Sequence, residues 1–176
     1  MGPADDSANF MGPLIDSEAL EKVRGYVQVG AEEGNILVGG EGPAGGYFAR
    51  PTIIEGIRPE HRLAQEEIFG PVLAMMRAEN FDDALRLAAS TPFALTAGIY
   101  SRNPLHLDRA RKELEVGNLY INRNCTGALV FRQPFGGFKM SGVGTKAGGP
   151  DYLINFMEPR TITENTMRRG FAPMEE

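Results

Sequence analysis

The sequence predicts an α/β fold built around a parallel sheet. Three apolar strands alternate with two amphipathic helices, at residues 72–76, 81–90, 95–100, 103–117 and 119–121. Nearly continuous apolar strands separated by helices are typical of parallel sheets, because such strands are covered on both faces. A glycine-rich block at 126–152 follows the last of these strands. Ligands of open parallel sheets bind beyond the carboxyl ends of the strands, so this block is a candidate binding surface.

The first half of the chain begins with a helix predicted at 18–33. Asp16 and Ser17 can cap its start, and Gly34 ends it. Apolar residues recur along it at helical spacing, with Tyr26 beside them: Leu20, Val23 and Val27. Short strands are then predicted around a glycine-rich turn at 42–46, namely 36–38, 47–48 and 51–54.

The two helices of the second half carry clear start signals. Asn80 is a predicted N-cap, and Asp82 and Asp83 lie in the first turn, where the helix dipole favours acidic side chains. Asn103 is followed by Pro104, a residue that suits the first helical position. This last helix is expected to bury one apolar face and to stop at Gly117, with the buried positions Leu107, Ala110 and Leu114.

Composition excludes several classes of protein. The chain has 176 residues and a net charge of −5, with no basic stripe, which argues against nucleic-acid binding. No apolar run approaches the roughly 20 residues of a membrane helix. The single cysteine, Cys125, excludes an internal disulfide and fits a reducing compartment, so we predict a cytoplasmic protein. No His/Cys cluster predicts a metal site.

Two adjacent carboxylates, Glu66 and Glu67, precede an apolar residue and then Phe69. An ionised carboxylate accepts two hydroxyl donors at once, which suits a ribose diol, and an aromatic side chain two residues later can pack on a flat ring. The same residues also fit a helix end with two solvated glutamates and a core phenylalanine. The spacing alone leaves both interpretations open.

Three motifs resemble the carboxyl-terminal part of the NAD(P)-dependent aldehyde dehydrogenase superfamily: MGPLI at 11–15, EEIFGPV at 66–72 and QPFGGFKMSG at 133–142. Within 126–153, the pattern TGALV, QPFGG, SG and KAGGPDYL resembles the 1-pyrroline-5-carboxylate dehydrogenase branch, also called L-glutamate γ-semialdehyde dehydrogenases. The resemblance implies three segments: part of the catalytic domain at 1–156, an oligomerisation strand at 157–167 and a tail at 168–176. The polar-apolar alternation of 158–164 fits a strand that pairs with another subunit of a homo-oligomer.

The resemblance also implies roles for individual residues. Glu67 would hold the nicotinamide ribose of NAD, and Phe69 would pack near the nicotinamide. Gly127 and Ala128 match a loop whose main-chain N–H groups bind the α-carboxylate of the substrate, an arrangement that glycine permits. Phe135 matches an aromatic residue that flanks the aliphatic part of the aldehyde, although a plain core phenylalanine is the alternative.

The chain departs from the family pattern in its catalytic groups. Family members use a cysteine thiolate and a separate glutamate base, and we expect both, with the Rossmann-like domain, upstream of this chain. Cys125 has Arg123 nearby as its one activating neighbour, so a lining or buried thiol is favoured over a nucleophile. We therefore predict an inactive carboxyl-terminal fragment of an enzyme that oxidises L-glutamate γ-semialdehyde in proline degradation. The alternative is a non-catalytic assembly module that complements a separate amino-terminal half.

Overall fold

The computed structural model describes residues 1–40 and 42–166. It divides into two compact units, each described here by itself. The first unit contains residues 1–127 and 136–143, and the second contains residues 128–135 and the chain from Gly144 onward. Among the described residues, no helix is both long enough and apolar enough to cross a bilayer.

The first helix, α1 (Ser17–Glu33), begins one residue before its predicted start and has the predicted end, with Asp16 as its cap. The carboxylate of Asp16 accepts the N–H of Ala19 at 2.8 Å. Leu20 and Val23 are buried, as the helical spacing predicts. Tyr26, Gly30 and Glu33 follow one another at helical spacing and therefore lie on one face of α1. This face also contacts other parts of the chain. Gly30 is buried there, and a Cβ atom would lie 2.2 Å from Cδ1 of Ile54.

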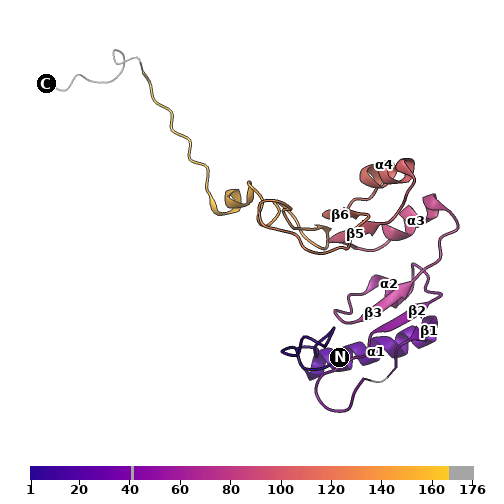
Figure 1. The fold of residues 1–176 in the computed structure, drawn as a ribbon. Coiled ribbons are helices and arrows are strands. Elements are labelled where there is room, and N and C mark those ends of the chain that lie inside the picture. The colour runs from indigo at the N-terminus through magenta and orange to yellow at the C-terminus, as the bar shows by residue number, and fades with distance from the viewer. Residues whose placement is uncertain (41, 167–176) are drawn as a thin grey trace. The chain divides into compact units, whose positions relative to one another are not determined.

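A three-stranded sheet packs beside α1 (Figure 1). Its strands lie in the order β1 (Asn35–Val38), β2 (Thr52–Glu55), β3 (Val72–Met75). β1 and β2 are antiparallel, whereas β2 and β3 are parallel. The core of this part of the chain is a cluster of buried apolar side chains from β2 and the segment after it: Ile54, Ile57 and Leu63.

Two predictions for this region are wrong. Residues 47–48 form no strand. The positive φ angles of Gly45 and Gly46 (82° and 68°) turn the chain out of extended geometry just before them, and the carbonyl of Tyr47 accepts the N–H of Leu14. The expected single parallel sheet is also absent from the described residues, since β3 pairs with β2 and not with the strands that follow it. Val72 and Ala74 of β3 pack against the β2 core, which explains this pairing.

The rest of the first unit contains the predicted elements in their predicted order: α3 (Phe81–Ala88), β5 (Thr96–Ile99), α4 (Pro104–Glu113) and β6 (Asn118–Ile121). It also contains two short strands that were not predicted, β4 (Phe93–Ala94) and β7 (Phe138–Lys139). The side chains of Asn80 and Asn103 cap α3 and α4, as predicted. α4 ends at Glu113, earlier than the predicted stop at Gly117, because Leu114 is already extended. β5 and β6 are parallel, and β4 pairs with β7 in antiparallel fashion.

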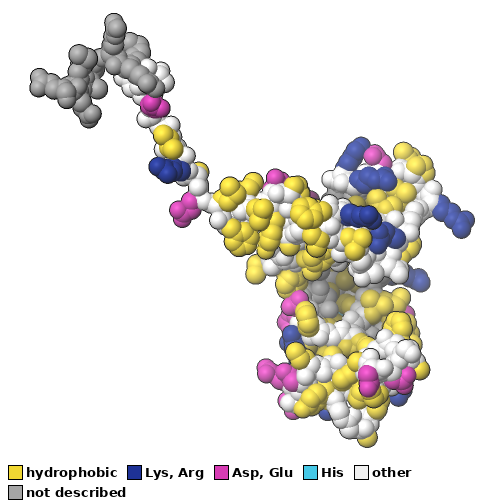
Figure 2. All heavy atoms as spheres, turned by 60° about the vertical axis from the view of Figure 1, so that its left-hand side comes forward, with side chains coloured by type: hydrophobic (Ala, Val, Ile, Leu, Met, Phe, Trp, Pro, Cys, Tyr) yellow, Lys and Arg dark blue, Asp and Glu magenta, His cyan; other side chains and the backbone are white. Residues whose placement is uncertain are grey.

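The second unit lacks a buried residue in its described part. Its regular structure is a 3-10 helix, η1 (Tyr152–Phe156), and an antiparallel bridge between Phe135 and Ala147. Large apolar side chains are exposed on it, and Figure 2 shows hydrophobic side chains over the part from which the extended C-terminal segment leaves. Residues 157–166 are exposed and form no strand. Residue 167 of the predicted oligomerisation strand and the predicted tail at 168–176 lie outside the described residues.

Candidate active site

The EEIFGPV motif follows a single helical turn, α2 (Arg62–Gln65), that α1 holds in place. The backbone N–H groups of Arg62 and Leu63 donate to the carboxylate of Glu33 at 2.9 Å and 3.0 Å. At the other end of the turn, the side-chain amide of Gln65 donates to the carbonyl of Pro59. The free N–H groups at the start of α2 therefore have acceptors, and the side chain of Gln65 ties its end to the preceding segment.

Glu66, the first of the two carboxylates, is fully engaged. It accepts two hydrogen bonds from the guanidinium of Arg62, both 2.9 Å, and one from the hydroxyl of Tyr26 at 2.5 Å. The hydrogen bonds from Arg62 and then Tyr26 lower the pKa of Glu66 to about 2. The same contact raises the pKa of Tyr26, because ionising the phenol would remove the proton of this hydrogen bond and would also place two negative charges together.

Glu67, the second carboxylate, is exposed and makes no hydrogen bond or ion pair within the part of the chain that the structure describes. Two residues later, the side chain of Phe69 is 84% exposed, which argues against the core phenylalanine that the sequence left open. Phe69 has a φ of 56°, a rare conformation for a bulky residue. Such strain concentrates at binding and catalytic sites. The turn thus leaves one carboxylate and one aromatic ring free for a ligand.

The engagement of Glu66 makes stability depend on pH. Its folded pKa of about 2 lies below the ordinary value of 4.5, so the carboxylate stabilises the fold above pH 4.5 and loses this effect as pH falls toward 2. In urea unfolding of the full-length protein, we expect Glu66→Gln to lower the urea midpoint at neutral pH. Near pH 2, its midpoint should equal that of the protein without the substitution. Glu115→Gln neutralises another exposed glutamate and should not change the urea midpoint. A decrease in the midpoint of Glu66→Gln that did not depend on pH would contradict the lowered pKa of Glu66.

The second candidate region lies at the carboxyl ends of β5 and β6. Asn122, directly after β6, accepts the N–H of Ser101 at 2.9 Å and donates to its carbonyl at 3.1 Å. The hydroxyl of Tyr100 donates to Oδ1 of Asn124 at 3.1 Å. These contacts tie the segment after β6 to the segment after β5, and they hold the start of the glycine-rich block at the strand ends.

Gly127 has a φ of 77°, which favours glycine over other residues. The guanidinium of Arg123 donates to the carbonyl of Thr126 at 2.9 Å and so braces the peptide before it. The N–H groups of Gly127 and Ala128 donate no hydrogen bond within residues 1–40 and 42–166. A free amide at a glycine of positive φ is one element of an anion-binding nest, in which successive N–H groups converge on an anion.

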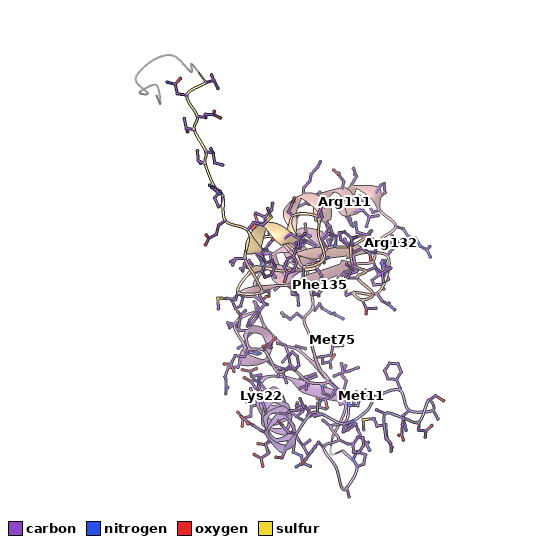
Figure 3. All side chains as sticks on the ribbon, turned by 90° about the vertical axis from the view of Figure 1, so that its left-hand side faces the viewer. Met11, Lys22, Met75, Arg111, Arg132 and Phe135 are labelled. Atoms are coloured by element: carbon purple, nitrogen blue, oxygen red, sulfur yellow. The ribbon has the colours of Figure 1, made fainter. Side chains whose placement is uncertain are left out.

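The remaining predicted substrate residue, Phe135, belongs to the second unit (labelled in Figure 3). Its N–H and carbonyl both bond to Ala147 at 2.9 Å, which closes a loop of the glycine-rich block. The ring is 38% exposed, so Phe135 is not a fully buried core residue. Ala128 belongs to the same unit, whereas Glu67, Phe69 and Gly127 belong to the first.

Cys125 is exposed and makes no hydrogen bond to another described residue. Its Sγ atom would lie 2.7 Å from a Cβ atom at position 98, so Gly98 leaves room for it. An activating base or cation in contact with the thiol is what a reactive cysteine requires. With none among the described residues, we treat Cys125 as a lining residue, although it is exposed and not buried.

Sequence reasoning missed the cluster formed by Tyr26, Arg62 and Glu66. The i,i+4 spacing of Arg62 and Glu66 carried a readable signal for one of its contacts. Tyr26 lies 40 residues before Glu66, and no local pattern joins the two.

The chain resembles known proteins over most of its length. A profile of the aldehyde dehydrogenase family matches residues 1–162. The 1-pyrroline-5-carboxylate dehydrogenase 1 of Halalkalibacterium halodurans is 50% identical over 93% of this chain. The chain spans about a third (32%) of the length of that relative.

Two solved structures extend this similarity. The 1-pyrroline-5-carboxylate dehydrogenase from Thermus with bound NAD is 51% identical, with a TM-score of 0.82 over 84% of this chain and 29% of its own. Proline utilization A from Bdellovibrio bacteriovorus is 53% identical, with a TM-score of 0.89 over 98% of this chain and 18% of its own.

Proposed function

Because the chain belongs to the aldehyde dehydrogenase family, we propose that the protein to which it contributes oxidises L-glutamate γ-semialdehyde to L-glutamate with NAD+. The observation that carries this proposal is the 50% identity to a 1-pyrroline-5-carboxylate dehydrogenase over 93% of the chain. The pattern TGALV, QPFGG, SG and KAGGPDYL within 126–153 resembles the same branch. The chain covers about a third (32%) of that relative, so the activity is proposed for the whole protein.

We propose that Glu67 and Phe69 hold the nicotinamide end of NAD+. The chemistry of the turn fits this group, because Glu67 is an unpaired acceptor suited to a ribose diol and Phe69 offers an exposed ring. When bound, NAD+ supplies the hydride acceptor for aldehyde oxidation. The residues of this chain bind and orient it; the strained backbone at Phe69 fixes the ring outward, which supports a preformed site.

We propose that the free N–H groups of Gly127 and Ala128 bind the α-carboxylate of the substrate. A carboxylate bound by main-chain amides is held by charge-assisted hydrogen bonds, which are stronger than neutral ones. Phe135 would then flank the aliphatic part of the aldehyde. We expect the nucleophilic cysteine and the general-base glutamate from a part of the enzyme that precedes this chain in sequence, so residues 1–176 contribute binding groups and no reacting group.

The direct test is the reaction itself. The purified full-length protein is incubated with L-glutamate γ-semialdehyde and NAD+, NADH is followed by absorbance, and the product is identified by mass spectrometry. We expect equal amounts of NADH and L-glutamate. Production of neither compound, from a folded protein that binds NADH, would overturn the proposed substrate.

We further propose that the catalytic-domain segment 1–156 is followed by an oligomerisation strand at 157–167, in a cytoplasmic homo-oligomer. The described part of this strand is extended and exposed, with Ile162 74% exposed, and an unpaired edge seeks a partner. The same observation favours the alternative assembly module. Size-exclusion chromatography with light scattering on residues 1–176 tests both ideas, because a folded monomer would argue against any need for a partner.

A further inference from the structure

Two side chains of α1, those of Tyr26 and Glu33, bind the segment that immediately precedes Glu67. Tyr26 and Glu33 lie seven residues apart and therefore on the same face of α1. Glu33 binds the start of α2 through two backbone N–H groups, and Tyr26 binds Glu66 at the end of α2. One helix face thus holds both ends of the turn that precedes the motif.

The phenol of Tyr26 is itself held in position. Its ring packs against the buried cluster of Ile54, Ile57 and Leu63. The guanidinium of Arg62 lies 5.7 Å from the ring centroid, and the ammonium of Lys22, one turn earlier on α1 (Figure 3), lies 6.0 Å away. The hydroxyl that binds Glu66 therefore belongs to a ring anchored on the core, which makes it a defined attachment point and not a mobile surface contact.

The local backbone converts this attachment into an orientation. Glu66 is extended, with φ −105° and ψ 144°, and successive side chains of extended backbone point to opposite sides. Because the Glu66 side chain is bound toward α1, we expect this backbone to direct the Glu67 side chain to the side away from α1. Glu67 has no other contact among the described residues to fix it.

We infer that Tyr26, acting through Glu66, is a positioning residue for the nicotinamide-ribose carboxylate Glu67. This inference rests on the proposed role of Glu67 in binding NAD+. Without the contact between Tyr26 and Glu66, the turn at 66–70 adopts several conformations. The binding free energy of the cofactor then includes the entropy cost of ordering this turn. Tyr26 binds Glu66 and the core, so the effect of its loss should reach the cofactor through Glu67 and fall on the affinity for cofactor.

The test measures NADH binding by fluorescence titration of the full-length protein. We expect Tyr26→Phe, which removes only the hydroxyl, to raise the Kd for NADH about fivefold, the size of one modest hydrogen bond. The KM for NAD+ should rise in parallel, while the KM for the aldehyde stays within twofold, as a rough bound on experimental scatter. Glu66→Ala also removes the two hydrogen bonds from Arg62 and should raise the Kd at least as much. The double variant should show no increase beyond that of Glu66→Ala, because both changes break the contact between Tyr26 and Glu66.

The matched control is Tyr47→Phe, which removes a hydroxyl that makes no hydrogen bond among the described residues and should leave the Kd unchanged. A lower melting temperature with an unchanged Kd in both Tyr26→Phe and Glu66→Ala would show a purely structural contact and overturn the inference. If the full-length protein binds NADH but does not oxidise γ-semialdehyde, the proposed substrate is wrong. The Kd values of the variants still test the positioning role of Tyr26.

Discussion

Glu67→Gln in the full-length protein is expected to raise the Kd for NADH about 100-fold, since each hydrogen bond to a charged acceptor contributes roughly 1.5–3 kcal/mol. The amide keeps the size of the side chain but replaces one acceptor oxygen by an NH2 donor. One ribose hydroxyl therefore loses the acceptor for its proton. Fluorescence titration with NADH measures the effect directly. Because Glu67 has no partner among the described residues, the substitution should leave the melting temperature nearly unchanged.

Glu115→Gln provides the control for this experiment, since it removes the same charge from another exposed glutamate. We expect no change in its Kd for NADH. An unchanged Kd in Glu67→Gln would show that Glu67 does not touch the cofactor, and Phe69 and Glu67 would then be surface residues of a strained turn.

Gly127→Val should raise the KM for L-glutamate γ-semialdehyde by about 100-fold. A β-branched residue at a φ of 77° is strongly disfavoured, and left-handed backbone costs roughly 1–2 kcal/mol even for ordinary L-residues. The nearest atom to a Cβ at Gly127 is Nη2 of Arg123 at 3.6 Å, so the side chain has room and the effect comes from the backbone. Rotating this peptide redirects the two amides proposed to bind the carboxylate.

Gly56→Val is the matched control for the glycine experiment. Gly56 has a φ of 75° and open space around its Cβ position, but it lies in the turn after β2. Both variants should lose comparable stability in urea unfolding, and only Gly127→Val should raise the KM. Equal KM values in the two variants would remove the carboxylate-binding role from Gly127.

Local signals in the sequence predicted the helices well. Asp16, Asn80 and Asn103 each cap a helix through a side chain that reaches a backbone N–H two or three residues ahead. Contacts this short depend on neighbouring residues alone, so the pattern and the structure agree. The order of strands 72–75, 96–99 and 118–121 was also readable from their apolar character.

Local signals did not predict which strands pair. They also did not predict that Glu66 has partners and Glu67 has none among the described residues. β3 pairs with β2 because their side chains share a core, which depends on contacts between distant residues. Glu66 and Glu67 are chemically identical in the sequence. They differ in the structure because Tyr26, on another helix, binds the first and leaves the second free. The proposed binding role of Glu67 therefore comes from the family resemblance, and the structure adds only that this carboxylate has no partner among the described residues.

The most direct test of the account is a comparison of two aldehydes. The full-length protein is assayed with NAD+ and either L-glutamate γ-semialdehyde or pentanal, which lacks the α-carboxylate and the amino group. If the amides of Gly127 and Ala128 bind the carboxylate, kcat/KM should be at least about 100-fold higher for the γ-semialdehyde, because pentanal cannot accept the charge-assisted hydrogen bonds, each contributing roughly 1.5–3 kcal/mol. A ratio near one, or a preference for pentanal, would contradict the assignment of this chain to recognition of an amino-acid aldehyde.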